Sequence, residues 1–344
     1  MKIVVNKPTI TRKELEAVLD CLINDELAAG ESVKTFESAV ANLIGVKHAL
    51  AVSSLTAAYH LAYCAIGLGA GDEVILPSFF TIPSLSALSL TGAKAVLVDS
   101  GGDSIFPSPE DIKARITDAT KAIVVGHLFG YHYPITELRD TGVPIIEEIS
   151  HAIGTEIDET PCGKHGTIAV SSFNPCGIIT TGNGGVVLTS NAKYYSIMKD
   201  ARGNGGHKLS FEYSMTDFQA AMGSTQIARL PELLTRRREI ARVYHDSLKM
   251  TPHKPPFIYH DRFAYQTMPV IFNASNEKIE GFWRKQRIEV LRPLPIPLHQ
   301  FCGFDPKEFP HSERFAKKLF SVPLYPTLSR RDVEKIAKSL ANFV

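Results

Sequence analysis

The chain has 344 residues, of which 44% are hydrophobic and 21% are charged, and its formal net charge is +1. Such a composition is typical of a globular protein that is long enough for two domains. The balanced charge argues against nucleic-acid binding and against a role at a membrane surface, and no apolar run approaches the roughly 18 residues of a membrane-spanning helix. Five scattered cysteines and an N-terminus without a signal-peptide core indicate reduced thiols in a cytoplasmic protein.

Helical and strand patterns alternate along the first half of the chain. An amphipathic helix is predicted over residues 11–21, with one apolar face formed by Leu15, Val18, Leu19 and Leu22, and a second helix over 33–43. Strands are then predicted at 49–52, 73–76, 95–98, 122–125 and 144–146, with helices at 56–66, 82–90 and 109–116. This alternation predicts an α/β fold with a mostly parallel sheet that has helices on both faces. Ligands of such sheets bind beyond the carboxyl ends of the strands.

The last third of the chain predicts a smaller α+β domain. After helices at 193–200 and 216–227, a long helix around residues 236–244 is expected to bridge a large domain, residues 1–235, and a small domain, residues 236–344. The small domain is predicted to contain a strand at 264–272 and helices at 277–284 and 331–343.

One glycine-rich stretch, residues 171–188, stands out from this background. A short apolar strand is followed by Asn174-Pro175-Cys176-Gly177 and then by a turn with glycines at 182, 184 and 185. Such glycines permit a positive φ or a close approach of the backbone to another group. Taken alone, the stretch is explained by a tight hairpin between two buried strands.

The stretch resembles the cofactor segment of the DegT/DnrJ/EryC1/StrS family, which are sugar aminotransferases of the pyridoxal-phosphate (PLP) fold-type I class. Their pattern is Ser-Phe-His-x-Ser/Thr-Lys, two residues, and Thr-Thr-Gly-Glu-Gly-Gly, and its lysine carries PLP as an imine. The chain matches this frame from Ser172 to Gly185 but has Gly177 at the lysine position. Further family-like runs occur at residues 69–79, 91–95, 127–130, 217–223, 236–244 and 322–326. The resemblance implies a fold-type I aminotransferase-like architecture and a homodimer whose sites lie at the interface.

The resemblance assigns a phosphate cup and a ring-stacking position. In the cup, at the start of a helix, Thr56 is retained but Leu55 replaces a glycine, and the alternative role of Thr56 is a helix N-cap. Ser172 falls on a phosphate-binding serine, or is a strand serine bonded to backbone. Thr81 stands where the family has an aromatic residue on the pyridine face, and the adjacent Phe80 is expected to point elsewhere.

The resemblance also assigns a partner for the pyridine nitrogen. Glu148 takes the place of the family's aspartate, and His151 that of a glutamine or histidine. These two could equally form an acid–base pair or a polar pair at the sheet edge. Across the dimer interface, Glu212 and Ser214 lie in a run where the family supplies an asparagine to its neighbour's phosphate. A carboxylate about 4 Å from a phosphate charge costs at most on the order of 4 kcal/mol at an effective dielectric constant of 20.

Five departures therefore converge on one ligand: Gly177, Leu55, Thr81, Glu212 and Ser214. We expect that PLP is not bound in the family's way. Relatives that replace the lysine with histidine use pyridoxamine phosphate (PMP), but they still need the cup and the stacking residue, and residue 177 is not histidine.

Cys176 lies beside the lost lysine position, so Cys176, His151 and Glu148 are candidates for a nucleophile, a base and an orienting group. The alternative for Cys176 is a small buried hydrophobe. Cys162 and His165 have the Cys-x-x-His spacing of zinc ligands, and Cys176 could be a third ligand. Because the chain has no second clear pair of ligands, we expect no metal site. Lys164, between them, is a solvated loop lysine rather than a displaced imine-forming lysine.

The sequence leaves three functions open. The first is a family member without Schiff-base transamination that binds, or acts without PLP on, a nucleotide sugar or related metabolite in polysaccharide or secondary-metabolite biosynthesis. The second is a lysine-free PLP- or PMP-dependent sugar dehydratase or aminotransferase with His151 as acid/base. The third is a non-catalytic partner of an active homologue. Candidate residues for lining the substrate pocket are Tyr131, His132, Tyr133, residues 204–207 and His299.

Overall fold

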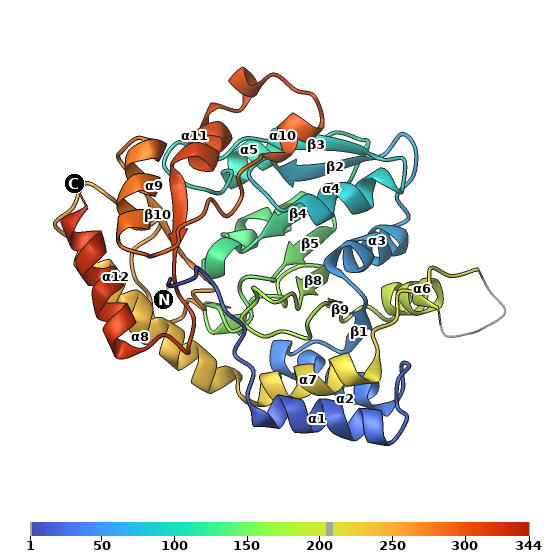
Figure 1. Ribbon diagram of the computed structural model, residues 1–344. Helices are drawn as coiled ribbons and strands as arrows, with labels where there is room; N and C mark the ends of the chain where they lie inside the picture. Colours follow the sequence, from blue (N-terminus) through green and yellow to red (C-terminus); the bar gives the residue numbers. More distant parts are fainter. Residues whose placement is uncertain (1, 204–208, 344) are drawn as a thin grey trace.

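The computed structural model describes residues 2–203 and 209–343, and Figure 1 shows their arrangement. Residues 204–207, named above as pocket candidates, lie outside the described residues. The first part of the chain contains, in order, α1 (Arg12–Ile23), α2 (Glu31–Ile44), β1 (His48–Val52), α3 (Leu55–Ile66), β2 (Glu73–Pro77), α4 (Ile82–Ser89), β3 (Lys94–Val98), α5 (Pro109–Lys113), β4 (Thr120–Gly126), η1 (Leu128–Gly130), η2 (Ile135–Thr141), β5 (Ile145–Glu148), β6 (Glu156–Ile157), β7 (Thr160–Pro161), β8 (Ile168–Ser172), β9 (Gly185–Thr189), α6 (Ala192–Arg202) and α7 (Asp217–Ala228).

The core of the molecule is a seven-stranded sheet in the order β1-β9-β8-β5-β4-β2-β3. The pairs formed by β8, β5, β4, β2 and β3 are parallel, and β9 runs antiparallel to both of its neighbours. The mostly parallel sheet predicted from the sequence is thus confirmed. Helices α3, α4 and α6 pack against its strands, and the parallel strands end at a common edge, where β2, β5 and β8 bring Pro77, Glu148 and Ser172.

Helix α3 begins one residue after Ser54, whose Oγ accepts a hydrogen bond from the backbone N–H of Ala57 at 3.1 Å. This residue is therefore the N-cap. The alternative role of Thr56 as an N-cap is wrong, because Thr56 already lies in the first turn of the helix. Gly67 ends α3 with a left-handed φ of 83°.

Helix α1 packs on α7, and its buried residues are Glu14 and Cys21. The buried carboxylate of Glu14 accepts hydrogen bonds from Gln226 at 2.7 Å and from Arg229 at 2.6 Å. The predicted leucine face points away from the rest of the chain, with exposed fractions of 64% for Leu15 and 53% for Leu19. An apolar helix face therefore has no cover within the described part of the chain.

The remainder of the chain forms the smaller part of the molecule, at the left and top of Figure 1. Its elements are α8 (Leu230–Leu248), β10 (Met268–Ile271), α9 (Asn276–Lys285), α10 (Leu298–Phe301), η3 (Pro306–Glu308), α11 (Pro310–Lys318), β11 (Leu319–Val322) and α12 (Arg330–Asn342). Strands β10 and β11 pair antiparallel, and α8 packs along α12. The predicted strand at 264–272 is shorter than expected. The N-terminal segment joins this part, since Ile3 pairs with Ile288. None of the described helices has the length and apolar character needed to cross a membrane.

Candidate functional site

A pocket of about 290 Å³ lies at the carboxyl ends of β2, β5 and β8. This volume is at the small end of ligand pockets, which run from roughly 300 to 1,000 Å³. The polar lining residues are Thr81, Glu148, Ser150, His151, Ser172 and Asn174, and the apolar ones are Leu55, Phe80, Ile82, Pro83 and residues 293–296. The family resemblance assigned Thr81, Glu148, His151 and Ser172 to one site, and all four line this pocket.

Glu148 is the acidic group of this pocket. It is buried at the end of β5, and its Oε2 accepts hydrogen bonds from Tyr59 Oη at 2.6 Å and from Thr81 Oγ1 at 2.7 Å. Burial raises the pKa of Glu148, and the hydrogen bonds from Tyr59 and Thr81 offset part of this rise. Glu148 is thus a carboxyl group that retains its proton to a higher pH than a surface glutamate.

His151 is held at the pocket wall in its neutral form. Its Nδ1 accepts a hydrogen bond from the backbone N–H of Phe129 at 3.3 Å, and its ring stacks on the Phe129 ring with centroids 5.8 Å apart. Burial lowers the pKa of His151 to about 4. Because Nδ1 is an acceptor, the neutral ring carries its proton on Nε2. His151 is therefore better suited to donate a hydrogen bond than to accept a proton at neutral pH.

Glu147 precedes Glu148 on β5 and points to the opposite side of the sheet, as alternate residues of a strand do. Its carboxylate accepts four hydrogen bonds: from His127 Nε2 at 2.9 Å and from the backbone N–H groups of Gly163 at 2.6 Å, His165 at 3.0 Å and Gly166 at 2.7 Å. Burial alone would raise the pKa of Glu147, but these hydrogen bonds outweigh it and lower the pKa. The two neighbouring carboxyl groups thus have opposite shifts.

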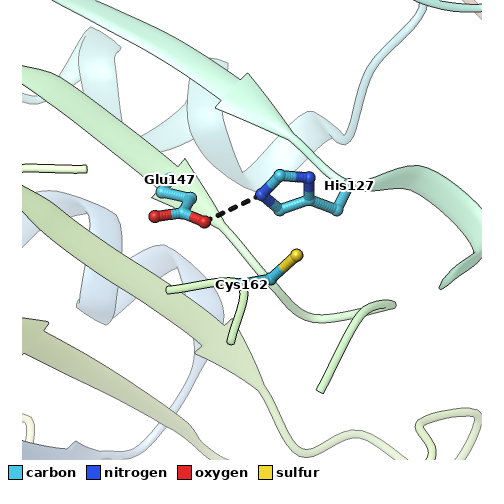
Figure 2. Close-up of side chains that lie close together, drawn as sticks. All are labelled: His127, Glu147 and Cys162. Atoms are coloured by element: carbon cyan, nitrogen blue, oxygen red, sulfur yellow. Dashed lines mark hydrogen bonds and ion pairs between the residues drawn. The ribbon is translucent and has the colours of Figure 1, made fainter. Parts of the chain in front are cut away.

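Glu147, His127 and Cys162 have the composition of a metal site, with one candidate ligand atom from each lying within 4.8 Å of the others (Figure 2). However, His127 Nδ1 already accepts the N–H of Tyr133 at 2.8 Å, so Nε2 carries the proton that Glu147 accepts. Burial also raises the pKa of the Cys162 thiol. The cluster is a hydrogen-bonded anchor for the loop at residues 163–166, without a free ligand atom on His127 or Glu147.

The profile of the DegT/DnrJ/EryC1/StrS aminotransferase family matches residues 8–341. The chain belongs to this family. Its structure is similar to that of the aminotransferase TlmJ from Streptoalloteichus hindustanus, with a TM-score of 0.92, 27% identity, and coverage of 99% of this chain and 98% of that one. For DesV of S. venezuelae the TM-score is 0.90, with 26% identity and coverage of 95% of this chain and 93% of that one. Spr1654 from Streptococcus pneumoniae, solved in a PLP-form, has the same fold, with a TM-score of 0.92, 23% identity, and coverage of 100% and 98%.

Residue 177 is glycine, so this pocket does not fit PLP bound in the family's way, as an imine of a lysine at that position. None of the described residues that line it is a lysine. Leu55, at the first position of α3, forms part of the pocket wall. Thr81 donates a hydrogen bond to Glu148. Phe80 was expected to point elsewhere but lines the pocket, and its ring occupies the space beside Gly126.

The turn at residues 174–177 is closed by hydrogen bonds. The N–H of Cys176 donates to Asn174 Oδ1 at 2.8 Å, and the carbonyl of Cys176 accepts from Asn6 Nδ2 at 2.7 Å and Gln266 Nε2 at 2.6 Å. A Cβ on Gly177 would lie 2.6 Å from the carbonyl oxygen of Ile179. The turn in this conformation has no room for any side chain at 177. Cys176 is exposed and is not among the residues that line the pocket with His151 and Glu148.

The glycine turn that follows packs against the start of α3. Gly182 and Gly184 have φ values of 79° and 148°, and a Cβ on Gly185 would lie 2.7 Å from the carbonyl oxygen of Ser54. Both expected uses of glycine, positive φ and close approach, therefore occur here. Ser172 Oγ accepts the N–H of Asn174 at 3.2 Å, which agrees with its alternative role as a strand serine bonded to backbone.

The other sequence candidates lie outside this pocket. Glu212 is exposed with a φ of 51°, and Ser214 pairs with Val52 at the end of β1. Tyr131, Tyr133 and His299 are buried. Within the described ranges, Cys162, His165 and Cys176 do not form a metal-ligating group, and Lys164 is exposed beside Gly45 at the end of α2.

Sequence reasoning missed two parts of the site. Tyr59, on α3, was unremarkable as one aromatic residue in an apolar helix, yet it donates to Glu148. Residues 293–296 close the pocket from the C-terminal part of the chain. The alternating prolines of that segment excluded a central strand but gave no signal that it approaches β5.

Proposed function

We propose that this protein has lost the Schiff-base transamination of its family and that it binds, or acts without PLP on, a nucleotide sugar or a related small polar metabolite. The observation that carries this proposal is a strand-end pocket that retains an acidic group and a histidine but is lined by no lysine among the described residues. Membership of this aminotransferase family supports the pathway class in this proposal.

The groups in the pocket favour recognition of hydroxyl groups. Burial raises the pKa of Glu148, so it retains a proton to a higher pH than an ordinary carboxyl group, and it could serve as a general acid or base. His151 offers a neutral Nε2–H as a donor. In this proposal Glu148 exchanges a proton with a substrate hydroxyl, His151 orients that hydroxyl, and Leu55, Ile82 and residues 293–296 exclude water. Cys176 would line the pocket with these residues only if the turn at 174–177 moved.

An absorbance titration with PLP and with PMP, across the near-ultraviolet and violet, tests the cofactor part of the proposal. We expect no saturable band for the unmodified chain. We also expect none for Gly177→Lys, because the backbone oxygen of Ile179 occupies the space that the new side chain needs. The matched control is Gly177→Ala, which introduces the same Cβ without an amine. Calorimetric titration with uridine and thymidine diphosphate sugars then tests binding, with Glu148→Gln as the variant expected to weaken it.

A saturable band in the unmodified chain would overturn the PLP-free proposal and favour the second candidate, a lysine-free PLP- or PMP-dependent enzyme. The observation in favour of that candidate is that Glu148 and His151 both line the pocket. In that case Glu148 would hold the pyridine nitrogen, and the cofactor would supply an electron sink.

We further propose that the protein is a homodimer in which the exposed apolar face of α1 is covered. This face consists of Leu15, Leu19, Leu22 and Ile23, which are 48% to 68% exposed. Exposed apolar patches of this kind mark protein interfaces. Leu19→Glu is expected to convert the dimer to a monomer in analytical ultracentrifugation, whereas Lys13→Glu, on the polar side of the same helix, is not. An unmodified chain that is monomeric alone but dimeric with a co-expressed active homologue would instead support the third function, a non-catalytic partner.

A further inference from the structure

A second cavity lies away from the strand-end pocket, in the C-terminal part of the chain. It has a volume of about 900 Å³ and is formed by the C-terminal half of α8 and by the segment 251–262. It shares no lining residue with the pocket around Glu148. Cavities of this size hold organic ligands.

Part of the cavity wall is apolar and firmly packed. The lining includes Leu248, Pro255, Pro256, Phe257 and Ile258. Phe257 is fixed from behind by Phe106 and Tyr131, with ring centroids 5.4 and 4.9 Å away. Ile258 is 86% exposed at the surface of the same segment. A large exposed aliphatic side chain beside an open apolar wall favours a ligand with an apolar or aromatic body.

The charged groups of the lining are four cations and two carboxylates. Three of the cations have acidic partners: Arg242 with Asp261 at 3.0 Å, Lys249 with Asp246 at 2.7 Å, and Arg262 with Glu159 at 3.1 Å. Lys254 is different, because its ammonium forms no hydrogen bond or ion pair with any described residue. One positive charge at this cavity is therefore left without a counter-charge.

A buried polar group in the wall also lacks a partner. His245 is 8% exposed, and its Nε2 has no hydrogen-bond partner among the described residues. Burial lowers the pKa of His245 to about 4, so the ring is neutral at pH 7. Buried polar atoms in native proteins are usually satisfied, and an unsatisfied one beside a cavity points to a missing partner.

We propose that this cavity binds an organic anion, a molecule with an apolar or aromatic body that carries a phosphate or carboxylate group. The apolar wall around Phe257 and Ile258 receives the body, and Lys254 receives the negative group. Both nucleotides and fatty carboxylates have this chemistry. The site goes beyond the function proposed above and does not depend on it.

Fluorescence titration with 1-anilinonaphthalene-8-sulfonate, an aromatic anion that becomes fluorescent in apolar sites, tests the proposal on the full chain. We expect one saturable site per chain. Lys254→Glu and Ile258→Glu should each raise the dissociation constant by about tenfold or more, since each places a negative charge beside the bound anion. Both positions are exposed, so the variants are expected to fold. The matched controls are Lys307→Glu on η3 and Leu90→Glu after α4, which lie outside the cavity.

Displacement of the bound probe separates the two sources of the anion. Release by uridine diphosphate identifies a nucleotide, and release by dodecanoate identifies a fatty carboxylate. In either case the release should be weaker in Lys254→Glu. Equal binding of the probe by the pocket variants and the controls would overturn the proposal. So would a probe that neither anion displaces, because that result would mark an adventitious additive only.

Discussion

Replacing Glu147 by alanine is expected to lower the free energy of unfolding by about 3–5 kcal/mol, the range found when one member of a buried charged network is removed. The variant leaves His127 Nε2–H and the backbone N–H groups of Gly163, His165 and Gly166 without their acceptor. Each buried donor without a partner costs about 1–3 kcal/mol. Because whole domains are stable by only about 5–15 kcal/mol, the variant should be close to unfolding.

Urea denaturation followed by circular dichroism measures this loss. The single tryptophan, Trp283, is buried in α9 and gives a second signal from the C-terminal part of the chain. The matched control is Glu156→Ala, an exposed glutamate on β6, which belongs to the separate two-stranded sheet with β7. A loss below about 1 kcal/mol, comparable with an ordinary surface substitution, would contradict the anchoring role of Glu147.

Acidification from pH 6.5 to pH 4 is expected to remove about 2–3 kcal/mol of stability through His151 alone. Its pKa is about 4 in the folded protein, against 6.5 for a free histidine. Between these values the unfolded chain binds a proton that the folded chain does not, so stability falls as the pH falls, by about 1.4 kcal/mol per pH unit. The whole difference between these two pKa values corresponds to more than about 3 kcal/mol of stability. The expected loss is smaller because the ring is partly exposed to the pocket, where water screens part of the effect.

Glu148 has the opposite effect on how stability depends on pH. Its pKa is raised from 4.5, so the folded chain retains a proton that the unfolded chain has lost, and stability falls as the pH rises above about 4.5. Denaturation curves at several pH values should therefore give a shallower pH dependence for His151→Gln and a steeper loss on acidification for Glu148→Gln. Parallel curves for the unmodified chain and His151→Gln would contradict the lowered pKa.

Much of the sheet was predictable because buried parallel strands have continuous apolar runs. The segments at 73–76 and 122–125 are such runs, and they became β2 and β4. The meeting of Thr81, Glu148 and Ser172 was implied by the family resemblance, and it agrees with the rule that parallel strands end at one edge of a sheet.

The predictions that were wrong concern features that depend on contacts between segments far apart in the sequence. The apolar periodicity of α1 predicted a helix, but periodicity alone does not say whether the same chain covers the apolar face, and Glu14 proved to be the buried group. Cys176 is next to Gly177 in sequence, yet its placement depends on Asn6 and Gln266, which are 170 and 90 residues away. No local pattern encodes such hydrogen bonds.

The carbonyl of Cys176 has a mechanical consequence for the whole molecule. It joins the N-terminal segment through Asn6, the strand-end turn, and the C-terminal part through Gln266. The same turn holds Asn174, which lines the pocket and bonds to the Cys176 N–H. A ligand that displaces Asn174 would therefore disturb hydrogen bonds that connect three separate segments. The hydrogen bonds of one peptide group therefore connect the pocket turn with both the N-terminal segment and the C-terminal part.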